Sequence, residues 1–175
     1  MNLVICGPCG VGKSSIAIYF AHQSQMKYLD LDEIRAADME RRKGVPSPCS
    51  VSYLNLIECL SSKLDGVTKN FVLDIGGDTV FRPRANNIDR LNQIFWLKKT
   101  YAAKVALLMA KREILLQRFN SSKKRNESEF DQLWKDWYSV GLPFWQKCAD
   151  KSFDTSTNTI DETSRQLQDM LNNCI

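Results

Sequence analysis

A short segment near the start of the chain has the residue types and spacing of a phosphate-binding loop. Residues 7–14, GPCGVGKS, match the pattern G-x-x-x-x-G-K-[ST]. Glycines let backbone N–H groups converge on phosphate oxygens, and a helix that follows directs its positive dipole end there. The lysine is placed to reach the β- and γ-phosphates, and the serine hydroxyl to ligate Mg²⁺. An ordinary glycine-rich turn is the alternative. We predict nucleotide contacts from Gly7, Gly10, Val11, Gly12, Lys13, Ser14 and Ser15, with Lys13 also catalytic.

The same segment contains a second motif, because Cys6-Gly-Pro-Cys9 has the spacing of a thioredoxin active site. There, a thiolate of low pKa at a helix start attacks disulfides. A redox site does not need the Gly-Lys-Ser that follows, so the sequence favours the phosphate loop. For the two thiols, small buried hydrophobic side chains are the favoured interpretation. A redox switch, in which oxidation of Cys6 and Cys9 distorts the loop, stays as a hypothesis.

Two carboxylates follow the second expected strand, in the segment Tyr28-Leu-Asp30-Leu-Asp32. Open α/β sheets bind ligands at the carboxyl ends of their strands. Since Asp30 and Asp32 share strand parity, we expect both to face the cleft. One can hold the hydration shell of Mg²⁺ while the other accepts a proton from an attacking hydroxyl. We assign the proton to Asp32; the alternative is an acidic helix start.

A third carboxylate, Asp74, ends the apolar run Phe71-Val-Leu and resembles a Walker B aspartate. An ordinary Asp-Gly turn would have the same pattern. The glycines that follow would let the backbone approach a substrate. We expect Ser14, Asp30 and Asp74 on the metal side, and Gly76 and Gly77 beside the phosphoryl acceptor.

Residues 111–125 carry six cations against one acid and lead into the polar stretch 121–129, which we expect to be a mobile surface loop. A lid moves to admit substrate, and its cations neutralise negative charge on the phosphoryl group during transfer. A basic segment beside a mobile loop is typical of such a lid. We predict a small mobile lid over about residues 112–129. A solvated basic helix face is the alternative for any single cation.

Apolar runs and helical patterns alternate between these motifs. Strands are expected at 3–6, 28–31, 71–75, 105–109 and 152–155, and helical spacing occurs at 14–22, 53–60, 88–95 and 161–171. Strands separated by helices predict βαβ units. The expected fold is a P-loop NTPase of the three-layer α/β/α class with a five-stranded parallel sheet. Since 175 residues without a long linker suit one domain, we expect a single domain over 1–175.

The composition and net charge of the chain limit the classes of ligand and partner that it can bind. With 43% hydrophobic and 25% charged residues, the chain is typical of globular proteins. Its net charge of +4 suits an anionic ligand but is small for a nucleic-acid binder. The start lacks the basic residue of a secretory peptide, so we expect a cytoplasmic, reducing location in which the six cysteines form no structural disulfides. We expect a small-molecule acceptor and no association with a membrane. Nucleic acid is a disfavoured partner, and a monomer is the favoured oligomeric state.

Over nearly its whole length the chain resembles the shikimate kinase family of small P-loop kinases. The resemblance is carried by the phosphate loop, the Asp-Leu-Asp at 30–32, the Gly-Gly at 76–77 and the segment 142–150. It implies transfer of the γ-phosphoryl group of ATP to a hydroxyl, with ATP and Mg²⁺. It also implies adenine-side contacts from Arg118, Thr155 and Asn158, and a lid arginine, Arg125, that stabilises the transferring group.

The acceptor half of the family pattern is not matched. No F-R-x-x-E segment lies between Arg42 and Asn70, Gly141 stands in place of a second arginine, and Asp78 replaces the third glycine. These changes remove two cations and add an anion, which would leave a carboxylate substrate unpaired and repelled. We therefore expect an acceptor other than shikimate.

Two other functions stay open. Asp32-Glu-Ile-Arg35 resembles the D-x-x-R element of phage-type polynucleotide 5′-kinases and zeta-toxin-like kinases, in which the Asp is the base and the Arg binds an anionic group of the acceptor. Such a kinase would use Asp32 and Arg35. The other alternative is a nucleotide-binding ATPase or regulator without a specific acceptor.

Overall fold

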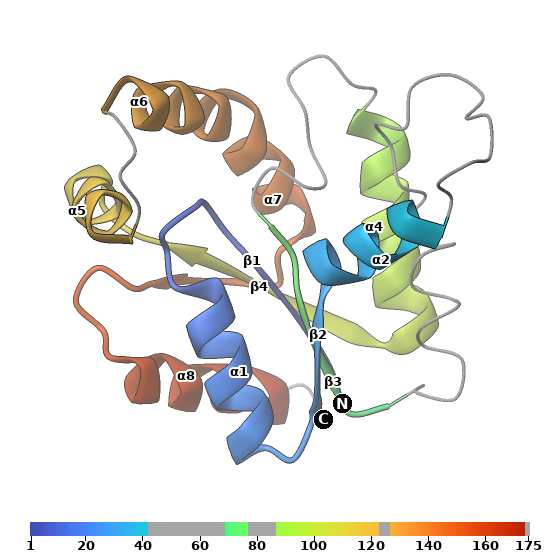
Figure 1. The fold of residues 1–175 in the computed structure, drawn as a ribbon. Coiled ribbons are helices and arrows are strands. Elements are labelled where there is room, and N and C mark those ends of the chain that lie inside the picture. Colours follow the sequence, from blue (N-terminus) through green and yellow to red (C-terminus); the bar gives the residue numbers. More distant parts are fainter. Residues whose placement is uncertain (42–68, 77–86, 123–126, 174–175) are drawn as a thin grey trace.

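The centre of the fold is a parallel five-stranded sheet with the strand order β2-β3-β1-β4-β5 (Figure 1). The computed structural model describes residues 1–41, 69–76, 87–122 and 127–173. All five expected strands are confirmed to within two residues at each end. They are β1 (Asn2–Cys6), β2 (Lys27–Asp30), β3 (Phe71–Asp74), β4 (Ala103–Met109) and β5 (Lys151–Asp154).

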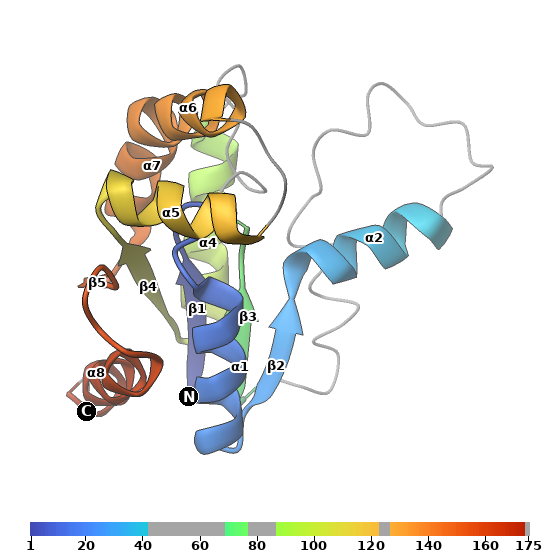
Figure 2. The same ribbon diagram turned by 60° about the vertical axis from the view of Figure 1, so that its left-hand side comes forward.

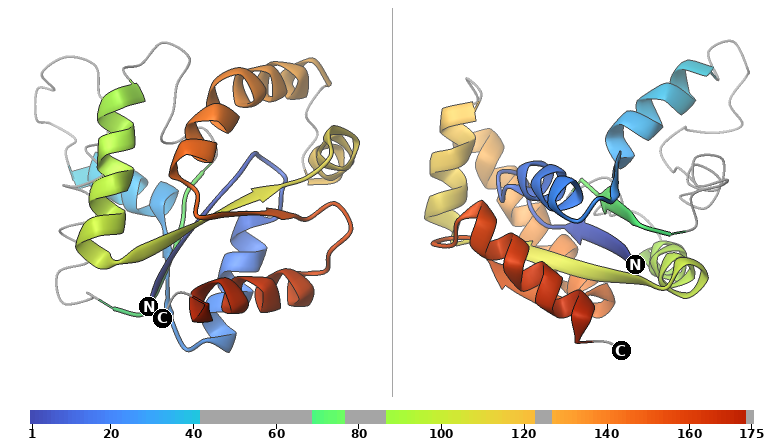
Figure 3. Two further views of the ribbon diagram at one scale, coloured as in Figure 1. Left: turned by 180° about the vertical axis from the view of Figure 1, so that it is seen from behind. Right: turned by 90° about the horizontal axis from the view of Figure 1, so that it is seen from below.

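Helices cover both faces of the sheet, as the three-layer prediction requires. Helices α1 and α8 lie side by side on one face, and α4 and α7 lie on the other (Figure 3). Helix α2 leads away from the end of the edge strand β2 (Figure 2). The bounds are α1 (Lys13–Gln23), α2 (Leu31–Arg41), α4 (Asn87–Tyr101), α5 (Arg112–Ser122), α6 (Glu127–Asp136), the π-helical turn η1 (Trp137–Gly141), α7 (Leu142–Cys148) and α8 (Ile160–Asn172).

The alternation of side chains along β1 explains why the strands of the sheet could be predicted from the sequence. Leu3 and Ile5 pack into the cluster formed with α1, α5 and α8, whereas Val4 and Cys6 pack into the cluster formed with α4 and α7. All four are fully buried. A central strand buried on both faces appears as a continuous apolar run, because period-two alternation puts every residue in one of two cores.

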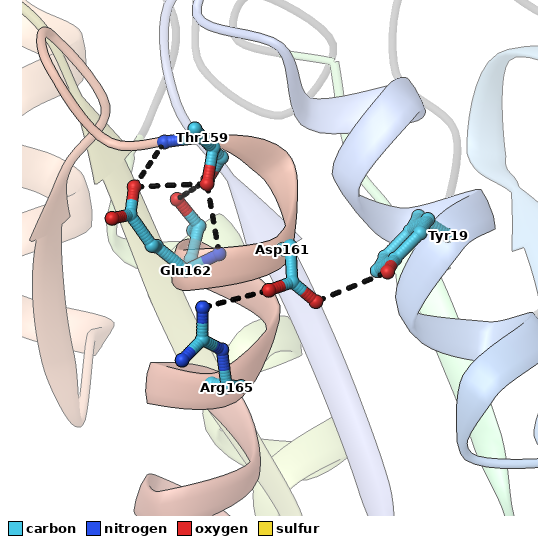
Figure 4. Close-up of polar contacts among 6 residues, drawn as sticks. Tyr19, Thr159, Asp161, Glu162 and Arg165 are labelled. Atoms are coloured by element: carbon cyan, nitrogen blue, oxygen red, sulfur yellow. Dashed lines mark hydrogen bonds and ion pairs between the residues drawn. The ribbon is translucent and has the colours of Figure 1, made fainter.

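The start of α8 is held by a capping box (Figure 4). Thr159 accepts from the Glu162 N–H at 3.1 Å, and the Glu162 carboxylate accepts from the Thr159 N–H at 2.7 Å. Asp161, in the same turn, accepts a hydrogen bond of 3.1 Å from the Tyr19 hydroxyl of α1. The segment that enters α8 is therefore tied to the helix that follows the phosphate loop.

The expected surface loop at 121–129 is wrong at both of its described ends. Ser121 belongs to the last turn of α5, and α6 begins at Glu127, where acidic residues favour a helix start. The helical run from 127 to 148 was also missed, although Phe130, Trp134 and Tyr138 recur every four residues and stack on one another. Residues 123–126 and the helical pattern at 53–60 lie outside the described residues.

In the part of the chain that the structure describes, no helix combines the length and the apolarity needed to cross a membrane.

Candidate functional site

The predicted phosphate loop connects β1 to α1 and passes close over β4. A Cβ atom added at Gly7 would lie 2.4 Å from the Leu108 carbonyl oxygen, so the path is open only to glycine. Gly12, with φ of 95°, precedes the first turn of α1, and no described side chain caps that turn. Uncapped N–H groups at a positive helix end form an anion site. A phosphate group therefore fits this loop.

The predicted catalytic lysine and the predicted carboxylates meet in one pocket of about 160 Å³. The Lys13 ammonium group donates to the Pro8 carbonyl oxygen at 2.9 Å, across the loop itself. The cation of the pocket thus comes from the phosphate loop, and its carboxylates come from β2, α2 and β3. The lining residues are Cys9, Lys13, Ser14, Asp30, Asp32, Asp74 and Gly76.

Asp30 and Asp32 reach this pocket by a route that strand parity did not predict. Strand β2 ends at Asp30, and Asp32 lies in the first turn of α2. The Asp30 carboxylate accepts from the N–H groups of Asp32 at 2.8 Å and Glu33 at 3.3 Å, which starts the helix. The shared parity is therefore wrong and the acidic helix start is correct, yet both carboxylates line the pocket.

Asp74 lies directly opposite Asp30 in the register of β2 and β3, and is only 4% exposed. Its Oδ1 atom has no hydrogen-bond partner among the described residues. Burial raises the pKa of Asp74, while the Ser14 hydroxyl and the Lys13 ammonium group lower it. A buried carboxylate oxygen without a partner, beside a second carboxylate, fits a cation or a strong hydrogen-bond donor.

Tyr28, which contacts two carboxylates of this site, was not predicted from the sequence. Its hydroxyl lies 3.4 Å from Oδ2 of both Asp30 and Asp74 and can donate to either carboxylate. Burial, followed by the charges of Asp74 and Asp30, raises the pKa of Tyr28. The sequence did contain one indication of this contact. Tyr28 lies two residues before Asp30, and this spacing puts both side chains on the same face of β2.

Divalent metal would be held here by few protein ligands. Among the described residues, no group of three or more His, Cys, Asp or Glu side chains is close enough to form a metal cage. Mg²⁺ usually keeps several waters and takes one or two carboxylates together with substrate phosphates. Ser14, Asp30 and Asp74 fit that kind of partial coordination.

Two of the three predicted adenine-side residues, Arg118 and Thr155, contact each other and the phosphate loop. Arg118 of α5 donates to the Thr155 carbonyl oxygen at 2.8 Å and to the Val11 carbonyl oxygen at 3.4 Å. Thr155, which follows β5, is 2% exposed, and its hydroxyl lies 3.0 Å from the same Val11 oxygen. Asn158, three residues later, is half-buried and contacts Gln166.

Other predicted residues lie outside this assembly. Arg125 and Gly77 are outside the described residues, and Arg35 lies in α2 without a described side chain. Arg112, a cation of the predicted lid, pairs with Asp131 and lies 5.5 Å from the centre of the Phe130 ring, so it joins α5 to α6.

The two cysteines of the competing motif have different environments. Cys6 is buried, and its thiol lies 3.4 Å from the Ala106 carbonyl oxygen. Burial, with a smaller contribution from Cys148, raises the pKa of Cys6 well above its usual range. A thioredoxin nucleophile needs a lowered pKa. Cys9, in contrast, is exposed and lines the pocket, so the prediction of a buried side chain is wrong for this thiol. The environment of Cys6 therefore fits a buried hydrophobic side chain and not a redox nucleophile.

Comparison with known proteins gives the family. The family described as shikimate kinase matches residues 9–172. Shikimate kinase from Bacteroides thetaiotaomicron is 17% identical, with a TM-score of 0.69 and 98% of each chain covered. Shikimate kinase from Acinetobacter baumannii, solved with shikimate, is 21% identical, with a TM-score of 0.64 over 99% of this chain and 94% of that one.

A gluconokinase from Sinorhizobium meliloti is 14% identical, with a TM-score of 0.61 over 98% of this chain and 91% of that one. No curated protein sequence matches the chain. At these identities the solved structures show a shared fold, and the acceptor is not given by them.

Proposed function

The chain belongs to the shikimate kinase family, and from that premise we propose that it is an ATP-dependent kinase. It transfers the γ-phosphoryl group of ATP to a hydroxyl of a small molecule other than shikimate. The observation that carries this proposal is the pocket that the phosphate-loop residues Lys13 and Ser14 line together with three carboxylates. A site that combines phosphate-binding groups with proton-accepting carboxylates suits phosphoryl transfer to a hydroxyl.

On the nucleotide side, Lys13 leaves the Pro8 carbonyl oxygen and binds the β- and γ-phosphates, while the uncapped N–H groups at the start of α1 bind phosphate oxygens. The adenine end lies against Arg118 and Asn158, while Thr155, only 2% exposed, supports this side of the site from behind the loop. The phosphate contacts comprise Gly7, Gly10, Val11, Gly12, Lys13, Ser14 and Ser15.

On the metal side, Ser14, Asp30 and Asp74 would hold Mg²⁺, directly or through its water shell, and the ion would supply positive charge against the phosphates. Asp30 already accepts two backbone N–H bonds, whereas Oδ1 of Asp74 has no partner among the described residues. This difference supports Asp74 as the carboxylate with the freer oxygen.

On the acceptor side, Asp32 orients the attacking hydroxyl and accepts its proton. The hydroxyl oxygen forms the new bond to the γ-phosphorus as the bond from that phosphorus to the β,γ-bridging oxygen breaks, and ADP leaves. Gly76 and Gly77 allow the acceptor to approach the backbone. Arg125 stabilises the charge of the transferring group from the lid.

The acceptor is a small hydroxylated molecule. Gly141, in place of the family's arginine, is buried in the π-helical turn η1 and offers no cation to a carboxylate. Structural neighbours include a gluconokinase and a sugar kinase, so polyols and sugars form the first group to test. We further propose a cytoplasmic monomer with one domain over residues 1–175, a location that suits the free thiols of Cys6, Cys9 and Cys148.

Thermal shift with a panel of hydroxylated small molecules tests the proposal. The protein is held with Mg²⁺ and a non-hydrolysable ATP analogue, and a true acceptor raises Tm by mass action. Lys13→Ala is the matched control and should lose both the analogue-dependent shift and turnover. If Lys13→Ala keeps ATP affinity and turnover, the proposal fails.

One observation favours a second candidate, a polynucleotide 5′-kinase-like or zeta-toxin-like enzyme. Asp32 lies in the first turn of α2, and Arg35 follows one turn later on the same helix. Such an enzyme would phosphorylate a nucleic-acid end or a nucleotide-linked sugar, and its affinity for a polyanionic acceptor would fall steeply with salt. A low ATPase rate that no acceptor stimulates would instead favour a nucleotide-binding ATPase or regulator without a specific acceptor.

A further inference from the structure

One buried threonine joins three segments that surround the phosphate loop. The Thr155 hydroxyl lies 3.0 Å from the Val11 carbonyl oxygen and 3.2 Å from the Met109 carbonyl oxygen, and donates its proton to one of them. Arg118 donates to the same hydroxyl at 3.3 Å. The Thr155 N–H donates to Met109 at 2.7 Å. The phosphate loop, the end of β4 and helix α5 therefore meet at this side chain.

The contact with Val11 controls the direction of a backbone donor. In a trans peptide, the C=O of one residue and the N–H of the next point in opposite directions, and the chain has no cis peptide bond among its described residues. With the Val11 oxygen held toward Thr155, the Gly12 N–H points in the opposite direction, away from Thr155. Gly12 has φ of 95° and no side chain to restrict it. The orientation of this peptide thus depends on what holds the Val11 oxygen.

The segment that carries Thr155 is itself fixed on both sides. Before α8, the Ser156 N–H donates to Asp154 at 2.7 Å, and the Ser156 hydroxyl accepts from the Lys111 N–H at 2.9 Å. At the helix start, the capping box holds Thr159, and Asp161 bonds to Tyr19 of α1 (Figure 4). The position of Thr155 is therefore held by its neighbours, and its hydroxyl can orient the phosphate loop.

We propose that Thr155 is a positioning residue that orients the Val11–Gly12 peptide for phosphate binding. Arg118 contacts both Thr155 and Val11, so the same group of contacts links the adenine side of the site to the phosphate loop. The inference rests on the proposed nucleotide binding at this loop. It adds a role for a side chain that is 2% exposed and acts from behind the loop.

The test compares three ligands of the full-length protein by calorimetry: ADP with Mg²⁺, inorganic tripolyphosphate, and adenosine. Thr155→Val keeps the shape of the side chain and removes the hydroxyl. Loss of one hydrogen bond that holds the loop should weaken ADP and tripolyphosphate binding about tenfold and adenosine binding less than about twofold. Thr155→Ser, which restores the hydroxyl, should return both phosphate ligands to within about threefold of the wild type.

Thr163 supplies a matched control, because it is another fully buried threonine whose hydroxyl donates to a carbonyl oxygen, that of Thr159 at 3.0 Å. Thr163→Val should lower Tm without changing the affinity for tripolyphosphate. If Thr155→Val does not fold, Thr155→Ala, which removes the hydroxyl together with the γ-methyl group, is judged by the same criteria.

Three results overturn the proposal: wild-type affinity for tripolyphosphate in Thr155→Val, an equal loss for adenosine, or no recovery in Thr155→Ser. Failure of the wild type to bind ADP and tripolyphosphate would overturn the proposed function together with this inference. Wild-type binding with no effect of Thr155→Val would overturn this inference alone.

Discussion

The phosphate-loop residues and the carboxylates of the site, here named its phosphate end and its carboxylate end, differ in how completely their polar groups are paired. At the phosphate end, the Val11 carbonyl oxygen is held by Thr155 and Arg118, and Lys13 has a carbonyl partner at 2.9 Å. At the carboxylate end, Asp74 has an oxygen without a partner among the described residues, and Tyr28 lies 3.4 Å from each of two carboxylates.

The difference indicates which part of the site is built in advance. An anion site made of backbone N–H groups needs its loop oriented before the ligand arrives, because reorganisation costs binding energy. A carboxylate that binds a cation, the role proposed for Asp74, stays incompletely paired until that ligand arrives. This contrast parallels the sequence, in which the ATP half of the family pattern is matched and the acceptor half is not.

The largest expected effect separates the two ends by function. Asp32→Asn keeps the shape of the side chain but cannot accept the proton, so kcat should fall about 10²–10⁴-fold. The Kd for ATP should stay within about twofold, because this residue is at the carboxylate end. Steady-state kinetics and calorimetry on the same preparation give both values. Equal losses in kcat and ATP affinity would contradict an acceptor-side role.

A substitution in the loop tests whether the phosphate end is built in advance. In Gly7→Ala, the new Cβ would meet the Leu108 carbonyl oxygen at 2.4 Å, so the loop must move. The free energy of unfolding in urea should drop by about 2–3 kcal/mol. Gly10→Ala is the control, since its nearest contact is 3.5 Å away although its φ of 80° is also positive. An equal cost at both positions would attribute the effect to backbone conformation alone.

Asp74→Asn tests the incomplete pairing at the carboxylate end. Burial raises the pKa of Asp74 above its ordinary value of 3.8. The folded protein then binds this proton more tightly than the unfolded chain does. The contribution to stability falls as pH rises from about 4 through the raised pKa, and it stays lost above that value.

In the absence of ligand, Asp74→Asn should therefore be more stable than the wild type by about 1–2 kcal/mol at neutral pH, with a smaller difference near pH 4. Thermal unfolding between pH 4 and 8 measures this. A difference that does not change with pH would show that the Asp74 charge is not the cause.

The smallest expected effect concerns the start of α8, which is tied to the helix that follows the phosphate loop. Thr159→Ala removes the capping side chain of α8 and should lower the free energy of unfolding by about 0.5–1 kcal/mol. Thr159→Ser keeps the cap and should match the wild type. A loss in Thr159→Ser equal to that in Thr159→Ala would assign the effect to the methyl group and not to the cap. Urea denaturation of the three proteins measures it.

The parts predictable from sequence are those whose physics is local. The five strands could be predicted because strands buried on both faces are continuous apolar runs, as at Leu3 to Cys6. The start of α1 followed from the glycine-lysine-serine pattern. The run from α6 to α7 was missed, since its aromatic spacing lies within a polar, charged stretch. Strand parity failed at Asp32, because Asp30 caps a helix one residue earlier than expected.

By itself, the sequence determined the phosphate loop, the parallel sheet and the family of this chain. Contiguous residues encode these features through backbone conformation, apolar runs and a helix start. Only the tertiary structure decided that Asp74 shares a pocket with Asp30 and that Tyr28 contacts both carboxylates. It also decided that Cys6 is buried with a raised pKa, and that Thr155 contacts Val11 across 144 residues of sequence. Burial and pairing depend on which segments meet in space, and no local pattern specifies that.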